Sequence, residues 1–477
     1  MRQINQKKND PIRSGYAPAA SRIYYGWIVV AACFLVIAPV MPLMLPAFGI
    51  FQVPILDEFH WDRGDFAIAL SIHLVFSGLA APVAGGLIDR FGPRRVMPIG
   101  ALMTALALIL MSRGGALWHF YVAFGLMAAA GSSLLQIVPL TTLVSNWFAR
   151  HRGTAIGIVS AGTGAGQLAL LPLVKLFIDQ IGWRHTYLFF GLVILVIPTT
   201  LILLFLHTRP EDRGLSIEDE SGRRRGRDEA GAKTEAGGGE LGQGDRGDRR
   251  TEVVILNKEW AEVDWTLGKA SRTFRFWTLA LVMTIFSAGM LLVTVQLVAY
   301  LGDKGYSSII VASVLLLQGA LNMVGEFFGG FLCDRIGREK TLTLSLLSFC
   351  ASIVFLNLAG AVSSPTLVYV FTLFYGIGQG MVAPALMTSA SDLFQGKHFG
   401  SILGVIFLGG YFGGAFGAWL GGRLFDLTGA YQVNFLISVL AMLTSTALIW
   451  WVRPGSVRQT RQLPGVEQNK EKSVETA

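Results

Sequence analysis

Three polar side chains recur at four-residue intervals in an otherwise apolar stretch, "LLLQGALNMVGEFFGG" (residues 315–330). Gln318, Asn322 and Glu326 therefore share one face of a predicted helix, because residues four apart lie above one another on an α-helix. A carboxyl group taken out of water favours its protonated form, and its charge returns when water reaches it again. An acid with two amides beside it is thus suited to binding a proton or a small solute.

The chain that surrounds this stretch has the composition of a membrane protein. Of its 477 residues, 52% are hydrophobic and 15% are charged, whereas a soluble domain carries about 25% charged residues. A helix needs about 20 apolar residues to cross a bilayer. We expect twelve such spans, at residues 24–53, 66–88, 96–112, 117–148, 154–177, 186–206, 276–300, 307–333, 341–361, 366–391, 399–422 and 432–452.

Within the interiors of these spans Glu326 is the only acid, and Lys175, close to the outer end of its span, is the only Lys or Arg. A charged acid at the centre of a membrane helix costs roughly 2.5–3.5 kcal/mol on insertion scales. Glu326 therefore needs a partner, a water-filled cavity or a bound proton. A structural hydrogen bond between helices is the alternative to a functional role.

A charged, glycine-rich segment separates the spans into two sets of six. Residues 207–275 carry too little apolar surface to fold alone, so we expect a flexible cytoplasmic linker, with a short amphipathic piece on the membrane surface near 252–270. The predicted organisation is an arm, a six-helix bundle, the linker, a second bundle and a tail, at residues 1–23, 24–206, 207–275, 276–452 and 453–477.

The distribution of basic residues predicts the orientation. The loops near residues 90–95, 150–152 and 335–340 are rich in Arg and Lys, as are both terminal segments. Such loops stay on the cytoplasmic side of a membrane. We therefore expect a multi-pass protein of the plasma (inner) membrane with both termini cytoplasmic. The net charge of +8 reflects these loops and does not indicate nucleic-acid binding.

The two halves are related to each other in sequence. "GGLIDRFGPRR" (85–95) matches "GFLCDRIGREK" (330–340), and "RGTAIGIVSAGTGAG" (152–166) resembles "FGSILGVIFLGGYFG" (399–413). Both pairs recur at nearly the same separation and at the equivalent helix of each half. Repeated six-helix units are typical of secondary transporters, whose binding site lies between the repeats near the bilayer midplane.

The turns after the second and eighth spans combine an acid, a glycine and several arginines. An Asp beside Arg at a helix end can form a charged latch, and the glycines allow close helix approach. The pattern G-x-L-x-D-R-x-G-x-R-R is similar to the signature of the major facilitator superfamily. The resemblance implies an all-α membrane protein with twelve helices in two pseudo-symmetric six-helix bundles. It also implies a gate at the cytoplasmic side, formed by Gly85, Asp89, Arg90, Gly92, Arg94, Arg95, Arg150, Arg152, Asp334, Arg335 and Arg338.

Two further stretches resemble the monocarboxylate and oxalate/formate branch of that superfamily: "YYGWIVVAACF" (24–34) and "WFARHRGTAIGIVSAGTGAG" (147–166). Members of this branch move small organic acids with a proton or in exchange for another anion. The first stretch lacks the acidic residue of the branch's motif. Glu326 also stands where the branch's N-x-x-G-R pattern has its substrate-binding Arg. An ionised Glu326 would repel a carboxylate, so a neutral, cationic or protonated substrate remains open.

Other polar residues in the spans are candidates for lining a central cavity, although each also fits a hydrogen bond between helices. His73 can titrate near neutral pH, or it can simply pack. The full predicted set for substrate or proton binding is Glu326, Asn322, Gln318, Gln296, Gln136, Gln167, Tyr375, Gln379, Tyr411 and His73.

The sequence shows no catalytic or metal-ligand constellation in the spans. "GTGAG" (162–166) and "GIGQG" (376–380) do not follow strands, so they do not indicate nucleotide binding. We therefore expect no enzyme and no cofactor, but a transporter whose partners are a small molecule, protons and the lipid bilayer. An exporter of neutral or cationic compounds, or a sensor acting through the linker, are the alternatives. The oligomeric state is left open, and a monomer is compatible with the sequence.

Overall fold

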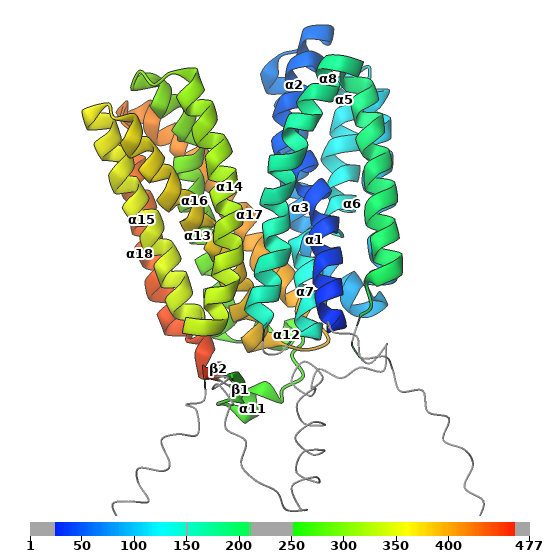
Figure 1. The fold of residues 1–477 in the computed structure, drawn as a ribbon, viewed down its shortest axis with the longest axis vertical. Coiled ribbons are helices and arrows are strands. Elements are labelled where there is room, and N and C mark those ends of the chain that lie inside the picture. Colours follow the sequence, from blue (N-terminus) through cyan, green and yellow to red (C-terminus); the bar gives the residue numbers. More distant parts are fainter. Residues whose placement is uncertain (1–23, 149–150, 209, 211–250, 463–477) are drawn as a thin grey trace, which may run out of the picture.

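The computed structural model describes residues 24–148, 151–208, 210 and 251–462, and these form long helices in two groups (Figure 1). The first group contains α1 (Tyr25–Met44), α2 (Pro46–Phe59), α3 (Arg63–Phe91), α4 (Pro93–Ser112), α5 (Leu117–Phe120), the π-helix η1 (Tyr121–Ala128), α6 (Ala129–Ser133), α7 (Ile137–Trp147) and α8 (Arg152–Phe205). The second contains α13 (Phe274–Asp303), α14 (Ser308–Ile336), α15 (Arg338–Val362), α16 (Pro365–Phe394), α17 (Phe399–Thr428) and α18 (Gln432–Val452).

The helix α8 is two membrane spans joined end to end. Its backbone leaves helical geometry at Gly182, where φ is 78° and ψ is 160°, a conformation that glycine adopts readily. Eleven stretches of the described chain are long and apolar enough to cross a membrane, and dividing the 54-residue α8 at Gly182 makes twelve. The prediction of twelve membrane helices is confirmed.

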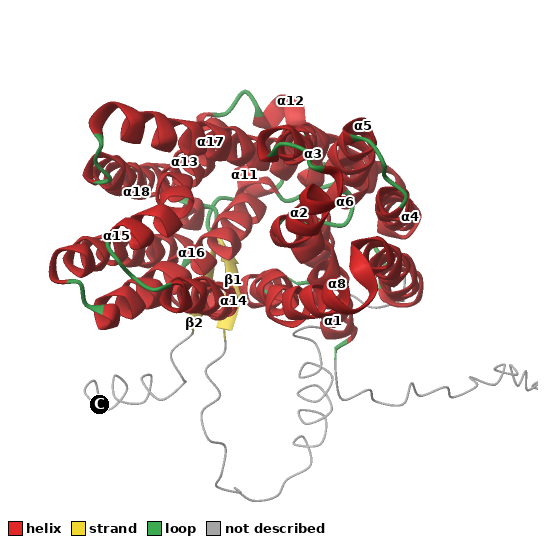
Figure 2. Ribbon diagram, turned by 90° about the horizontal axis from the view of Figure 1, so that it is seen from above, coloured by secondary structure: helices red, strands yellow, loops and turns green. Residues whose placement is uncertain are grey.

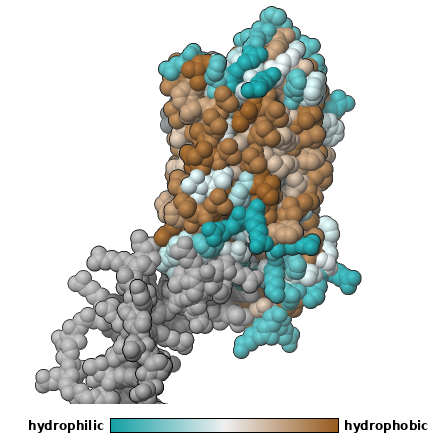
Figure 3. All heavy atoms as spheres, turned by 90° about the vertical axis from the view of Figure 1, so that its right-hand side faces the viewer, coloured by the Kyte–Doolittle hydropathy of each residue, from teal (hydrophilic) through white to brown (hydrophobic). Residues whose placement is uncertain are grey.

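The outer surface of the helices matches a bilayer. Figure 3 shows a broad hydrophobic band on the face formed by the first group, with hydrophilic residues above and below it. Large apolar side chains such as Leu102, Val122 and Val196 are exposed along this surface. Apolar side chains facing outward are stable in hydrocarbon, so burial inside the protein is not required of them.

Two helix pairs join the first group to the second: α3 packs on α17, and the first part of α8 packs on α14. These pairs occupy equivalent places in the two sequence repeats. They meet at the end of the molecule where α3 and α14 finish and α8 and α17 begin, which we call the linker end. Figure 1 shows α8 and α14 diverging from the linker end toward the opposite end, and Figure 2 shows the two groups side by side from above.

A small non-membrane unit lies at the linker end. Strand β1 (Thr251–Ile255) pairs antiparallel with β2 (Arg458–Gln462), Thr251 being opposite Gln462. The short helices α11 (Lys258–Ala261) and α12 (Leu267–Ala270) follow β1, and the 3₁₀ turn η3 (Pro454–Ser456) precedes β2. The sheet therefore joins the segment that leads into the second group of helices to the segment that follows it.

The residues after β1 dock onto the end of α16 through two tryptophans. Trp260 Nε1 donates a hydrogen bond to the carbonyl of Leu393 at 2.8 Å. The ring of Trp265 packs edge-on against Phe394 with 5.2 Å between centroids. The Arg275 guanidinium lies over the ring of Trp260, 4.5 Å from the ring centroid, an arrangement that is favourable for a cation over an indole.

This unit departs from the predicted organisation. The sequence predicts a flexible linker with a short amphipathic piece over residues 207–275 and predicts neither strand. Residues 251–275 instead form β1, α11 and α12 against the second group of helices. The physical reason is that Trp260 and Trp265 find an apolar partner surface at the end of α16, which averaging hydrophobicity over the linker does not reveal. Residues 209 and 211–250 of the predicted linker lie outside the described residues.

Replacing Trp260 by Ala should loosen this docked unit. The substitution removes an indole hydrogen bond and the ring contact with Trp265, so we expect the melting temperature of the detergent-purified protein to fall by about 2–8 °C. The control is Trp419→Ala, because Trp419 is 61% exposed and distant in sequence from the unit. An equal effect of both substitutions on melting would contradict the docking role of Trp260.

Candidate functional site

At the linker end, the carboxylate of Asp89 on α3 caps the first turn of α17. Its oxygens accept hydrogen bonds from the backbone N–H of Gly400 at 3.1 Å, the N–H of Ser401 at 2.9 Å and the Ser401 hydroxyl at 3.1 Å. The first N–H groups of a helix have no partner inside the helix and carry partial positive charge. A negative side chain from the first group therefore holds the second group.

The second repeat makes the same contact in the opposite direction. Asp334 on α14 accepts from the N–H of Gly153 at 3.0 Å, and from the N–H and hydroxyl of Thr154 at 2.7 and 2.8 Å. These two residues belong to the first turn of α8. Asp89 and Asp334 thus form two reciprocal caps, each joining a helix end of one group to a helix start of the other.

Glycines bring the backbones of the two groups into direct contact beside these caps. A Cβ atom on Gly85 would overlap the carbonyl of Gly400, and one on Gly157 would lie 2.6 Å from the Glu326 carbonyl oxygen. A Cβ on Gly153 would lie 2.9 Å from the Cβ of Cys333. Larger residues at these positions would force the helices apart, so the glycines are required for closure at the linker end.

A buried ion cluster reinforces one of the two interfaces. Asp392, at the end of α16, lies 3.3 Å from Nη1 of Arg152 on α8 and 2.6 Å from Nε of Arg338 on α15. The three side chains are between 3% and 5% exposed. One carboxylate therefore joins a cation of the first group to a cation of its own group.

The sequence patterns predict Arg152 and Arg338 in the gate but do not indicate Asp392. The predicted tenth span ends at residue 391, so this acid falls in a loop. A signal was present: an acid at the loop end of the tenth span, beside the basic loops, is a natural counter-ion for them. Its pairing partners lie 240 and 54 residues away, which no local pattern indicates.

The remaining predicted gate residues have secondary positions. Arg94 contacts the Leu203 carbonyl and lies 3.4 Å from His207, while Arg95 is exposed. The guanidinium groups of Arg90 and Arg335 lie over the neighbouring rings of Phe91 and Phe331. Gly92, which has a φ of 78°, ends α3 in a turn that favours glycine. Arg150 lies outside the described residues.

Glu326 lies where α14 meets both α8 and α16. Its side chain is buried, and Oε1 accepts a hydrogen bond from Asn322 Nδ2 at 3.4 Å. Oε2 is also buried and has no hydrogen-bond partner among the residues that the structure describes. Gly380 of α16 contacts the backbone of Asn322 and Glu326. A buried, partly satisfied carboxyl group is costly unless it binds a proton or another ligand.

The predicted amides extend this site one turn at a time along α14. Gln318 Nε2 donates to Gln379 Oε1 of α16 at 3.3 Å. A Cβ on Gly319 would lie 3.4 Å from Gln167 Oε1 of α8, so this amide approaches from the other group of helices. The structure therefore brings together five of the predicted residues: Gln167, Gln318, Asn322, Glu326 and Gln379.

A second predicted pair bridges the two groups at the α17 interface. Tyr411 donates its hydroxyl hydrogen to Gln136 Oε1 at 3.0 Å, and Gln136 Nε2 donates to Ser132 at 3.3 Å. The backbone of Gln136 is extended, because the fourth span is interrupted between α6 and α7. This interruption directs an amide toward the second group of helices.

Three predicted residues join neither cluster. Tyr375 shares a 2.5 Å hydrogen bond with Thr294 of α13, and Gln296 is buried on α13 beside Gly421. Both contacts lie within the second group. His73 donates from Nδ1 to the Phe124 carbonyl at 3.0 Å and stacks on the Phe124 ring. These contacts give all three residues a packing position.

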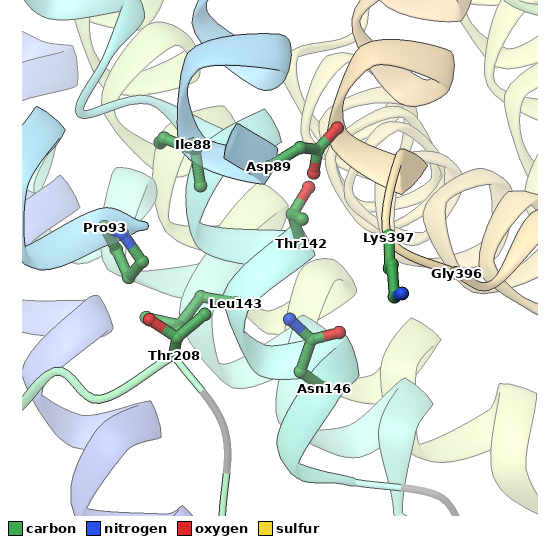
Figure 4. Close-up of a pocket in the computed structure, with 9 residues that line it drawn as sticks. All are labelled: Ile88, Asp89, Pro93, Thr142, Leu143, Asn146, Thr208, Gly396 and Lys397. Atoms are coloured by element: carbon green, nitrogen blue, oxygen red, sulfur yellow. The ribbon is translucent and has the colours of Figure 1, made fainter. Parts of the chain in front are cut away.

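A small pocket lies at the linker end, away from Glu326. It lies between the end of α3, the end of α7 and the loop before α17. Its lining includes Ile88, Asp89, Pro93, Thr142, Leu143, Asn146, Thr208, Gly396 and Lys397. Figure 4 shows the Asp89 carboxylate beside Thr142 and directed toward the second group, with Asn146 and Lys397 below. The pocket borders the cap formed by Asp89.

The fold and these contacts define a class of protein: a membrane carrier built from two related bundles that close against each other at one end. A family model for the Major Facilitator Superfamily matches residues 23–325 and 277–476. The chain therefore belongs to the Major Facilitator Superfamily. It is an integral, multi-pass membrane transporter and not an enzyme.

Curated relatives cover nearly the whole chain. Monocarboxylate transporter 13 of Bos taurus is 25% identical over 425 residues, which is 89% of this chain and 88% of that protein. The uncharacterized MFS-type transporter YcxA of Bacillus subtilis (strain 168) is 25% identical over 400 residues, 83% of this chain and 87% of YcxA. The solved structure of the proton:xylose symporter XylE bound to 6-bromo-6-deoxy-D-glucose has a similar fold, with a TM-score of 0.64 at 14% identity, covering 90% of this chain and 95% of XylE.

Removing the charge of Asp392 should open the linker end. Asp392→Asn removes the carboxylate that contacts both Arg152 and Arg338, and breaking a buried ion pair in this way costs about 3–5 kcal/mol. We expect Cys333, which is buried beside the interface, to react with a maleimide at least about tenfold faster, because 1.4 kcal/mol corresponds to tenfold in an equilibrium.

The internal control is Cys33, which is buried on α1 and should stay unreactive in wild type and variant. Glu262→Gln, at an exposed position outside the membrane helices, should leave Cys333 protected. Unchanged Cys333 labelling in a folded Asp392→Asn protein would show that the cluster does not hold the linker end closed.

Proposed function

We propose that the protein is a secondary active transporter of a small, monocarboxylate-like organic acid, which it moves with a proton or in exchange for another anion. The transport cycle is alternating access, in which residues 24–206 and 276–452 rock as two units about the central site. In the described state the Asp89 and Asp334 caps close the linker end. In the state that is open at the linker end, both caps must break and the helices at the linker end must separate.

The observation that carries this proposal is the position of Glu326. It is the acid buried between α14, α8 and α16 at the interface of the two units. Movement of α8 relative to α14 changes the surroundings of this carboxyl group directly. Protonation in the closed surroundings and release of the proton to water in the open ones would couple proton movement to the cycle.

The choice of an organic acid rests on the monocarboxylate transporters among the relatives and on the resemblance of residues 147–166 to that branch. Glu326 replaces the Arg of the branch's pattern, so an ionised Glu326 repels a carboxylate. A protonated Glu326 does not repel it. Proton binding and anion binding then favour each other, and linkage requires that the effect be reciprocal. Coupled binding of the proton and the anion would make the protein a symporter.

The alternative transport function is export of neutral or cationic compounds. Oε2 of Glu326 has no hydrogen-bond partner within the described part of the chain, which favours this function, because a cation could supply a partner. A panel of labelled carboxylates and amines in proteoliposomes, scored for proton movement, separates the two functions. A transporter-like sensor is the remaining alternative, and net substrate accumulation by purified protein would exclude it.

For the orientation, we propose that the linker end faces the cytoplasm, with both termini on that side of the plasma (inner) membrane. The described arginines and lysines at the linker end include Arg90, Arg94, Arg95, Arg335 and Lys340. Such clusters remain on the cytoplasmic side. The described state would then be closed to the cytoplasm, and substrate would enter from the opposite end.

Replacing Glu326 by Gln should uncouple uptake from pH. Gln preserves the size and the hydrogen bond with Asn322 but cannot release a proton. We expect wild-type uptake of the transported acid to rise by up to about tenfold for each unit that the external pH falls, over the range in which Glu326 is mostly ionised, and uptake by Glu326→Gln to be flat over the same range.

The matched control is Glu262→Gln, which changes an exposed acid outside the membrane helices and should keep the wild-type pH profile. Folding of both variants is checked by gel filtration and melting temperature. A wild-type pH dependence in a folded Glu326→Gln protein would remove Glu326 from the coupling step.

A further inference from the structure

A charged pair that the proposed mechanism does not use lies on α8, beyond the region where the two groups of helices touch. Lys175 Nζ is 2.6 Å from Asp179 Oδ1, and the side chains are 62% and 54% exposed. Within the interiors of the apolar spans, Lys175 is the only Lys or Arg. The pair lies between the close contacts with α14 and the break in α8 at Gly182.

The side of α8 that carries Lys175 is the side that faces α14. Gly157 and Gly164 contact α14 at Glu326 and Met323. Lys175 follows Gly157 by eighteen residues, about five turns of an α-helix, and the backbone stays helical over this stretch. Its side chain therefore leaves the helix in the same direction as these glycines.

Neighbouring residues on α8 support this orientation. Val174 and Ile178, which directly precede Lys175 and Asp179, are buried inside the first group of helices. A side chain one position further along the helix is rotated by about 100° from Val174. Lys175 is accordingly outside the core of its own group.

Beyond its contacts with α8 at Gly319 and Met323, the side of α14 that faces α8 is uncovered. Ala312 and Leu316 are exposed on this side, and α8 and α14 diverge toward this end in Figure 1. Further toward the linker end, Gln167 of α8 approaches Gly319 of α14, and Glu326 lies where α14 meets α8 and α16. A solute that enters between α8 and α14 therefore meets Lys175 before it meets the amides and the acid.

We propose that Lys175 is the entry site for the carboxylate group of the substrate, and that Asp179 is its resting counter-ion. This inference rests on the proposed function, because it requires an anionic substrate. The incoming carboxylate replaces Asp179 at the Lys175 ammonium group. The exchange is easy, because an ion pair exposed to solvent contributes little to stability. The positive charge also attracts anions that Glu326 alone would repel.

The first test is protection of Lys175 from chemical modification. Wild-type protein in lipid nanodiscs is treated with a limiting amount of an N-hydroxysuccinimide ester, with and without pyruvate as the probe, and modified lysines are quantified by mass spectrometry. At ten times its dissociation constant, pyruvate should slow modification of Lys175 about tenfold. Lys304, an exposed lysine after α13 at the same end, should react equally in both samples.

The second test is transport. At low salt we expect Lys175→Gln to raise the KM for pyruvate about tenfold through loss of electrostatic attraction, with the maximal rate unchanged. Lys175→Arg should retain the wild-type KM, and Asp179→Asn should lower it, because the competing carboxylate is gone. Lys304→Gln is the matched control and should behave as wild type. A wild-type KM in folded Lys175→Gln overturns the proposal.

The two tests distinguish failure of this inference from failure of the proposed function. Pyruvate uptake by wild type without protection of Lys175 overturns the entry site alone. Protection of Lys175 without uptake of pyruvate supports the entry site and contradicts transport of this carboxylate. Neither protection nor uptake contradicts both.

Discussion

The structure depends on two carboxylates that satisfy backbone N–H groups across the boundary between the bundles. Asp89 caps the start of α17, and Asp334 caps the start of α8. Each contact replaces the water that these helix starts would otherwise bind. The bundles can therefore separate only where water can again hydrate both the carboxylates and the N–H groups of the helix starts. That requirement places the closure at the end of the helices, and it could not be met in the middle of the bilayer.

The repeats share these caps but differ in charge around them. Asp392 joins Arg152 and Arg338 at the α8–α14 interface. In the aligned first repeat, Asn146 corresponds to Asp392 and Pro93 to Arg338. The α3–α17 interface thus has the cap and the glycine contacts, and its residues that correspond to Asp392 and Arg338 are uncharged. Separation of α8 from α14 must break a buried ion contact as well as a cap, so the two sides of the closure are held by unequal forces.

The interface that carries these ions also carries the polar residues of the candidate site. Along α14, the amides of Gln318 and Asn322 lead to Glu326, and Gly330 and Asp334 follow on the way to the linker end. Because α14 runs as one helix from Ser308 to Ile336, movement at the cap is transmitted to the acid without a flexible joint. This continuity connects the state of the closure to the surroundings of the carboxyl group.

The amino-acid sequence by itself determined the twelve membrane helices, the two repeats and the acids at the ends of α3 and α14. These features are set by local hydrophobicity and by internal similarity, which act over a few residues or can be compared directly. The sequence also indicated the stripe of Gln318, Asn322 and Glu326, because helical periodicity alone places these residues on one face.

Only the tertiary structure decided which of the candidate polar residues meet. It paired Gln136 with Tyr411 across 275 residues and supplied Asp392 as the partner of Arg152. It gave Tyr375, Gln296 and His73 packing positions instead. It also paired β1 with β2 at the two ends of the second bundle. Such contacts depend on how whole helices are oriented and how far they stand apart, and no property of the residues next to them in the chain specifies that geometry.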